Sequence, residues 1–225
     1  MINRSDFMFL QEHLPLFDRL APEEREMLAA TCSGAAYGPG ELILSRDREC
    51  NGLVLVKSGQ LRAFFEAEDG KEITLYRLLA GDICILSAAC VLKNLTFEVT
   101  LETEKKSAVL FIPASVWGKL TEKNSAAKEF SLELVNERFS EVMWVMEQMV
   151  SKNMGQRVAA FLLEQAALEG SDTLTLTHEA IAKNLGTARE VVSRILKYLE
   201  NDGLVRLSRG QIRLTDEKRL REMSR

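Results

Sequence analysis

The sequence predicts an α+β fold in three parts: an N-terminal antiparallel β-barrel or jelly roll, a long helix, and a C-terminal winged helix-turn-helix. Three observations lead to this prediction. Residues 37–113 alternate short β-rich runs with glycine turns, as barrels and jelly rolls do. Residues 125–150 contain no proline and repeat apolar side chains at helical spacing. Residues 177–200 contain two short helical patterns separated by a glycine.

The composition is that of a soluble globular protein with room for two modest domains. Of 225 residues, 46% are apolar and 28% are charged, which supports a sizeable core. The longest apolar runs fall well short of the ~18–20 residues that cross a bilayer. The chain begins with Met1-Ile-Asn-Arg-Ser-Asp6, which lacks the apolar centre of an export signal. We therefore expect a cytoplasmic protein without a membrane partner.

Short helices are expected before the barrel. Residues 5–31 carry helical patterns, with Pro22 at a helix start. After them, turn signals such as Ser58-Gly59 recur at short intervals and separate the predicted strands. The clearest strands are Leu53–Val56, Leu61–Phe65, Ile73–Leu79 and Ala108–Ile112.

The long helix carries a narrow apolar seam whose spacings alternate between three and four residues. This pattern is typical of a helix that pairs with another helix. A helix of roughly 26 residues spans about 39 Å, which is too long to rest on one small barrel. We therefore predict a dimerisation helix; an amphipathic helix lying on its own domain is the alternative. Off the seam, Met143 and Trp144 predict an additional contact with the barrel. The predicted dimer residues are Leu132, Val135, Phe139, Val142, Met146 and Met149.

The stretch from Thr177 to Glu200 predicts two helices joined by a tight turn. Thr177 can cap the first helix and Thr187 the second, and Gly186 supplies the turn. This arrangement is the helix-turn-helix of DNA-binding proteins.

One face of the second helix is apolar and the other is polar. At about 100° per residue, Val192, Leu196 and Leu199 group together. The opposite face begins with two arginines, a glutamate and a serine, which can hydrogen-bond to base edges in the major groove. Any surface helix has a charged face, however, and Thr187 with Glu190 could be a simple capping box. The predicted base-reading residues are Arg189, Glu190, Ser193 and Arg194.

The segment after the second helix favours DNA binding. Leu204–Ser208 and Gln211–Leu214 predict a hairpin about Arg209-Gly210, as in a wing. Arginines there would meet phosphates, which positions a protein on DNA without reading its sequence. Residues 151–225 hold 13 Lys and Arg against 10 Asp and Glu, whereas the preceding residues hold 16 against 23, so the basic tail suits an anionic partner. The predicted phosphate contacts are Thr177, His178, Thr187, Arg206, Arg209 and Arg213.

Several motifs resemble the Crp/Fnr family of bacterial transcription regulators, over nearly the whole chain. The sequence Ala188-Arg-Glu-Val-Val-Ser-Arg-Ile-Leu-Lys-Tyr-Leu-Glu-Asn-Asp-Gly-Leu-Val205 resembles that family's recognition helix and the approach to its wing. Tyr37–Leu44, Val56–Leu61 and Gly81-Asp82 resemble its sensor barrel. The resemblance implies an effector-sensing barrel with N-terminal helices at 1–120, a dimerisation helix at 121–151, and a DNA-binding winged helix-turn-helix at 152–225.

The resemblance also implies what the protein binds. It implies a homodimer on double-stranded DNA with an inverted-repeat operator, RNA polymerase as a further partner, and a small-molecule effector. By the same resemblance, the base-reading positions are Arg189, Glu190, Ser193 and Arg194. The family has two common forms of the recognition helix, and this sequence has features of both. The operator sequence therefore does not follow from it.

The sensor departs from the cyclic-nucleotide pattern of the family. Members that bind such ligands carry an arginine about ten residues after a Gly-Glu pair, whereas here residues 83–97 contain no arginine and Lys93 is their only cation. A lysine cannot reproduce the bidentate fork of arginine. We therefore expect an effector that is not a cyclic nucleotide. The expected effector pocket comprises Gly81, Asp82, Ile83, Cys84, Leu86, Ser87 and Cys90.

Two alternatives are a redox- or metal-responsive regulator acting through Cys84 and Cys90, and a DNA-binding protein that needs no ligand. The four cysteines are too few for a secreted disulfide scaffold. The N-terminal region has only Cys32, so the family's iron–sulphur cluster is not expected. Residues 37–113 contain no histidine, which metal-dependent enzymes on related jelly rolls require. We predict no catalytic residue and no metal site, and the sequence identifies no cofactor.

Overall fold

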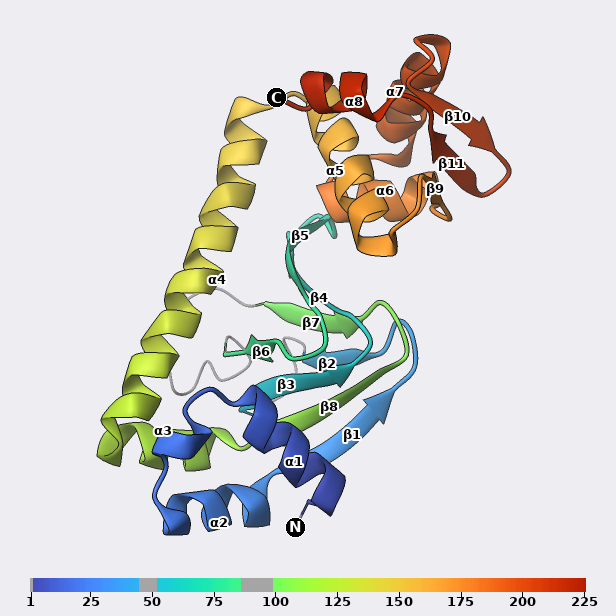
Figure 1. Ribbon diagram of the computed structural model, residues 1–225. Coiled ribbons are helices and arrows are strands. Elements are labelled where there is room, and N and C mark those ends of the chain that lie inside the picture. The colour runs from blue at the N-terminus through green and yellow to red at the C-terminus, as the bar shows by residue number, and fades with distance from the viewer. Residues whose placement is uncertain (1, 45–51, 86–98) are drawn as a thin grey trace. The chain divides into compact units, whose positions relative to one another are not determined.

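The chain forms two compact units in the computed structural model (Figure 1). The first unit comprises Met1–Phe65 and Leu75–Val142, and the second comprises Glu66–Thr74 and Met143–Arg225. The residues that the structure describes are 2–44, 52–85 and 99–225. Among them, no helix is long and apolar enough to cross a membrane.

Two antiparallel sheets form the centre of the first unit (Figure 1). Within the described ranges, one sheet has the order β1-β8-β3-β6 and the other β2-β7-β4-β5. This arrangement confirms the predicted barrel or jelly roll. The strands are β1 Ser33–Tyr37, β2 Leu42–Leu44, β3 Leu53–Ser58, β4 Leu61–Glu66, β5 Glu72–Leu78, β6 Ile83–Cys84, β7 Thr100–Thr103 and β8 Ser107–Ile112.

Strand β3 lies at the centre of the first unit because both of its faces are buried. Leu53 and Leu55 belong to an apolar cluster that includes Trp117 and the N-terminal helices. Val54 and Val56 point the other way, into a second cluster between the two sheets. An uninterrupted apolar run is what a strand needs when both faces are covered.

Helices cover one face of this sheet pair. The helical segments are α1 Arg4–His13, η1 Phe17–Arg19, α2 Pro22–Thr31 and α3 Ala114–Lys123. Pro22 stands at the first position of α2, as predicted, where its missing N–H costs nothing. The indole N–H of Trp117 donates to Ser131 Oγ at 2.9 Å, which ties α3 to the following helix.

Helix α4 runs from Ser125 to Ser151 and confirms the predicted long helix. Its first turns pack into the helix-side cluster through Ala126, Ala127 and Leu134. Met143 and Trp144, which were expected to make an additional contact with the barrel, are 41% and 53% exposed, and that contact stays a prediction. Most of the predicted seam is also open in the single chain: Leu132, Phe139, Met146 and Met149 are each more than 40% exposed.

The C-terminal part of the second unit is a small domain with its own apolar core. Val158, Leu162, Ile181 and Leu196 are among the fully buried residues that form it. Its first helix begins at Met154 and is capped at its C-terminal end by Gly170. The elements are α5 Met154–Glu169, β9 Thr173–Leu174, α6 His178–Leu185, α7 Arg189–Asn201, β10 Val205–Ser208, β11 Gln211–Leu214 and α8 Glu217–Met223.

Candidate nucleic-acid interface and sensor site

Three local features fix the ends of α6 and the turn that follows it. The Thr177 hydroxyl accepts a hydrogen bond from the Ala180 N–H at 3.0 Å, so the predicted cap of α6 is confirmed. Gly186 ends this helix with a left-handed φ of 64°, a conformation that glycine adopts without strain. The Arg157 guanidinium of α5 donates to the Leu185 carbonyl at 2.8 Å and satisfies an otherwise unpaired group at the helix end.

The start of α7 differs from the prediction. Its N-cap residue is Ala188, which makes no side-chain hydrogen bond. Thr187 was expected to hold this position, but its N–H is bonded to the Ala182 carbonyl at 3.1 Å as part of the turn after α6. The turn is therefore one residue longer than expected, and the recognition helix begins at Arg189.

Helix α7 buries its apolar face and exposes its polar one. Val192, Leu196 and Leu199 are completely buried in the core of the small domain. Arg189, Glu190 and Arg194 are exposed. In the described part of the chain, no hydrogen bond or ion pair engages the side chains of these three residues. Two guanidinium forks and a carboxylate are therefore available to a partner at the start of the helix.

Ser193 differs from the other predicted base-reading residues. It is half-buried, and its hydroxyl lies 2.8 Å from His178 Nδ1. This contact joins the first residue of α6 to the second turn of α7. Both residues belong to the predicted interface, but here they bind each other.

The wing forms where it was predicted. Strands β10 and β11 pair in antiparallel register with Arg206 opposite Arg213, and both side chains face solvent. Arg209 is exposed at the tip beside Gly210, whose φ is 73°. Arg213 Nε donates to Asp172 Oδ2 at 3.2 Å, so one of its donors is already engaged. The predicted phosphate residues of the wing thus lie on one hairpin.

The predicted effector segment is described only in part. Leu86, Ser87 and Cys90 lie outside the described residues. Asp82 Oδ2 accepts a hydrogen bond from the Leu79 N–H at 2.7 Å and closes the turn before β6. Cys84 is buried between the sheets, with its Sγ 3.7 Å from the Tyr76 hydroxyl.

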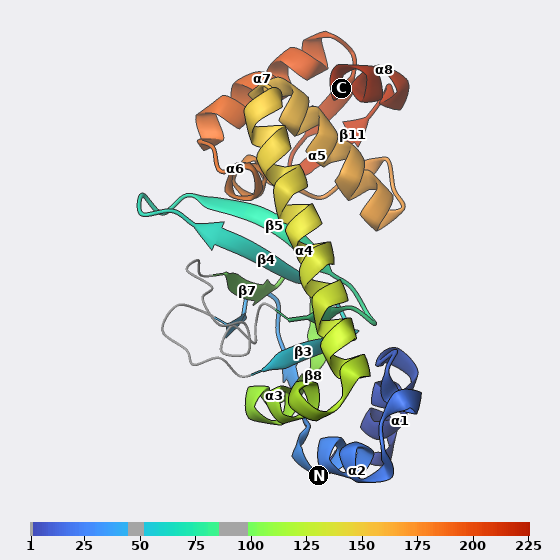
Figure 2. The same ribbon diagram turned by 90° about the vertical axis from the view of Figure 1, so that its left-hand side faces the viewer.

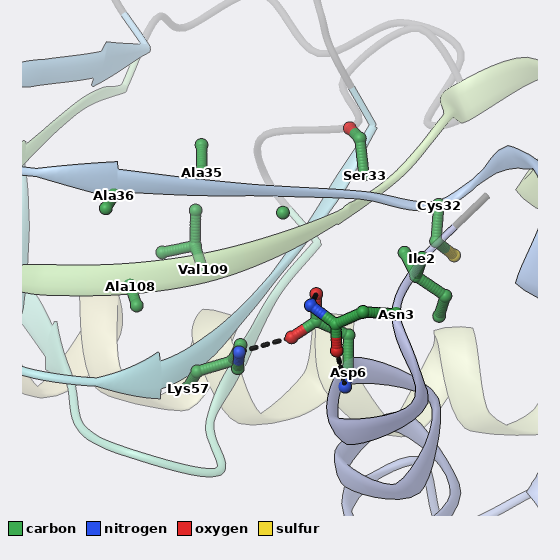
Figure 3. A pocket seen from close by; sticks show the side chains of 11 residues that line it. Ile2, Asn3, Asp6, Cys32, Ser33, Ala35, Ala36, Lys57, Ala108 and Val109 are labelled. Carbon is green, nitrogen blue, oxygen red and sulfur yellow. Dashed lines mark hydrogen bonds and ion pairs between the residues drawn. The ribbon is translucent and has the colours of Figure 1, made fainter.

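A groove of about 540 Å³ lies outside the sheets, between the start of α1 and strands β1, β8 and β3 (Figure 3). Its charged groups are the buried Asp6 and the Lys57 ammonium, which form an ion pair. The second oxygen of Asp6 accepts from Asn3 Nδ2 at 3.0 Å. Both carboxylate oxygens are thus engaged within the chain, and Figure 3 shows the ion pair with Lys57. Small side chains such as Ala35 and Ala108 form the rest of the wall.

The two described cysteines, Cys32 and Cys84, are both buried. Burial raises the pKa of the Cys32 thiol to about 12, so this side chain stays protonated and unreactive at neutral pH. Among the described residues, no group of three or more His, Cys, Asp or Glu side chains could hold a metal ion.

Comparison with known proteins decides the family. The Crp-like helix-turn-helix domain matches residues 156–223, and the cyclic nucleotide-binding domain matches residues 35–124. The crystal structure of a transcriptional regulator of the Crp/Fnr family from Eubacterium rectale is 40% identical, with a TM-score of 0.92, and covers 95% of this chain and 99% of that one. The chain belongs to the Crp/Fnr family.

Curated relatives within the Crp/Fnr family are more distant. The cyclic AMP receptor protein of Thermus thermophilus is 29% identical over 93% of this chain and 96% of its own length. The transcriptional regulator flp of Lacticaseibacillus casei is 27% identical over 94% of this chain and 96% of its own length. This Crp/Fnr protein is therefore a DNA-binding transcription regulator with a cyclic nucleotide-binding-like domain.

Proposed function

We propose that the protein is a homodimeric regulator that reads an inverted-repeat operator under the control of an effector other than a cyclic nucleotide. The observation that carries the proposal is the recognition helix. Arg189, Glu190 and Arg194 are exposed on α7 while its opposite face is completely buried. Arginine bidentate to guanine and glutamate to cytosine are contacts that specify sequence. RNA polymerase is the proposed partner on the promoter.

The open seam of α4 supports the homodimer. Phe139 is 63% exposed and Met146 is 55% exposed, and large apolar side chains in a row at heptad spacing favour helix pairing. A second copy offers the same seam, and two helices related by a two-fold axis bury it in both chains.

We propose an effector because the chain contains a domain that matches the cyclic nucleotide-binding domain. One difference in sequence argues against a cyclic nucleotide as that effector. One relative is named for cyclic AMP, yet residues 83–97 of this chain contain no arginine for a cyclic phosphate. The alternative to a small-molecule effector is a redox response through Cys84 and Cys90, which requires both thiols. Cys84 is buried beside Tyr76, where access of an oxidant or a metal ion to its sulfur is restricted.

Selection from random DNA tests the proposed readout. The purified full-length protein, incubated with a pool of random 40-base-pair duplexes, is expected to enrich an inverted repeat. A symmetric dimer places its two recognition helices about one helical turn apart, roughly 34 Å, so the half-sites should be centred about 10 base pairs apart. Sequencing of the bound fraction measures both the motif and the spacing. Absence of any enriched repeat would contradict the proposed function.

The wing has a separate role that salt titration measures. Arg209→Ala should weaken binding to operator and random duplex by the same factor, because phosphate contacts carry no sequence information. Each phosphate contact contributes about 0.9 to the slope of log affinity against log salt, so the dimer should lose about 1 to 2 from that slope. Arg213→Ala serves as the comparison, and its effect should be smaller because Arg213 also binds Asp172. A change confined to the operator would show that Arg209 reads bases.

A further inference from the structure

Among the described residues of the first unit, three arginines have side chains that are at least nine-tenths buried. Those of Arg62, Arg77 and Arg138 are 2%, 8% and 9% exposed. A buried guanidinium is stable only when its charge is paired and its donors are bonded. Arg62 and Arg77 meet this requirement, whereas Arg138 meets it only in part.

Arg62 and Arg77 are satisfied by carboxylates of a neighbouring strand and turn. Arg62 Nη1 donates to Glu102 at 2.6 Å, and its guanidinium stacks 4.2 Å from the Phe64 ring centroid. Arg77 donates from Nε and Nη2 to the two oxygens of Glu104, at 2.9 and 3.2 Å. Glu104 thus occupies the Nε–Nη2 edge of Arg77 in the side-on, bidentate geometry that suits a carboxylate.

Among the described residues, the same edge of Arg138 has no such partner. Arg138 Nη1 donates to Glu141 at 2.7 Å. Its Nη2 lies 3.6 Å from Glu137 Oε2, beyond hydrogen-bond distance. Its Nε is buried and has no hydrogen-bond partner in the structure. A buried N–H donor without an acceptor is costly, and it marks a place for an acceptor atom that the described residues do not supply.

The position of Arg138 connects this edge with the sensor. The guanidinium lies 4.9 Å from the centroid of the Tyr76 ring on β5, where α4 passes that strand (Figure 2). The Tyr76 hydroxyl in turn lies against Cys84, a residue of the predicted effector segment. Tyr76 belongs to the apolar inter-sheet cluster, together with Leu78 and Leu101. A cation with a free edge therefore borders an apolar cluster in the sensor.

We propose that Arg138 binds the head group of the effector, and that the effector is a small organic carboxylate with an apolar body. The two carboxylate oxygens would occupy the Nε–Nη2 edge of Arg138, as those of Glu104 occupy this edge of Arg77. The proposal rests on the proposed function, because it assumes that the sensor has an effector. It also explains how a sensor without the family's arginine in residues 83–97 holds an anion.

Charge and geometry favour a carboxylate over a phosphate group. Glu141 already binds one side of the guanidinium, and Glu137 lies near the other. Burial raises the pKa of the Glu141 carboxyl above its ordinary value, so additional negative charge is poorly tolerated here. A singly charged, planar group needs only the one free edge, whereas a phosphate dianion brings more charge than the site can pair.

Benzoate and benzamide provide matched probes, because they share a ring and differ in the charged head. Isothermal titration of the full-length protein should show at least about tenfold tighter binding of benzoate than of benzamide. Inorganic phosphate at the same concentrations should not bind. Glu141→Gln should tighten benzoate binding several-fold, because it removes the competing carboxylate. Arg138→Met should abolish the preference for benzoate, and Arg138→Lys should reduce it, because lysine keeps the charge but lacks the planar edge.

Arg77→Met is the matched control. It removes an equally buried arginine whose edge Glu104 already fills, so it should lower the melting temperature and leave the ratio of the two affinities unchanged. Equal affinities for the two probes in the unaltered protein would overturn the proposal. So would a preference for benzoate that persists in Arg138→Met and Arg138→Lys. The selection of operator sequences is carried out in the absence of benzoate and benzamide. A failure of the proposed carboxylate site can therefore be distinguished from a failure of the proposed DNA recognition.

Discussion

Arg194→Ala should weaken operator binding by at least about 30-fold and remove the preference at one base position of each half-site. A bidentate arginine–guanine contact is worth about 1–3 kcal/mol. A symmetric dimer makes this contact twice, so the expected cost is about 2–6 kcal/mol where the half-sites act additively. Arg194 is exposed on α7 without a bonding partner in the described chain, so the substitution should leave the melting temperature unchanged. Fluorescence anisotropy with single-base operator variants measures the affinity and the base profile.

Lys197→Ala is the control for a general loss of positive charge. Lys197 is also exposed on α7, but its ammonium is bound to Glu200 at 2.8 Å. Its replacement should change affinity by less than about threefold and should not alter the base profile. A uniform loss of affinity in Arg194→Ala, with the base profile of the unaltered protein, would show that Arg194 contacts phosphate. The reading face would then have to be reassigned, with Arg189 as the next candidate.

The sequence predicted those elements whose local signals agree with their packing. The α7 helix has its apolar residues at positions that the small domain buries, and β3 has the continuous apolar run of a strand buried on both faces. Strand β1, in contrast, consists of Ser-Gly-Ala-Ala-Tyr, a composition with little strand preference. It is held by five residue pairs with β8, a long-range interaction that local patterns do not contain.

The residues of the candidate sites also differ in whether the sequence could predict them. Arg189, Glu190 and Arg194 could be predicted because they stand on the polar face of a helix with a clear period. Arg138 could not, because a charged residue in an amphipathic helix is ordinarily assigned to solvent. The overlooked signal was its register: Arg138 follows Ala127 and Leu134 by eleven and four residues, which places it on the face of α4 that is buried. Which residue would face it, Tyr76, follows only from the fold.

Met146→Glu should convert the protein into a monomer at micromolar concentration. Met146 lies in the proposed seam, 55% exposed in the single chain, and in a parallel pair it stands near its symmetry mate. The substitution would place two carboxylates in an apolar interface, where neither has a cationic partner, and burying an unpaired charge is strongly unfavourable. The dimer dissociation constant should rise by at least about 100-fold, or about 2.7 kcal/mol. Sedimentation equilibrium measures it directly.

Ser140→Glu adds the same charge to the same helix away from the seam, at an exposed position, and should remain a dimer. Operator binding should follow the assembly state, because a monomer engages one half-site and loses the gain from holding two together. Both variants should keep the helical content of the unaltered chain, since Met and Glu have similar helix propensities and Ser140 lies at the surface. If Met146→Glu and Val142→Glu both remain dimers with full operator affinity, the seam does not form the interface. The two recognition helices would then have to be brought together by another surface of the protein.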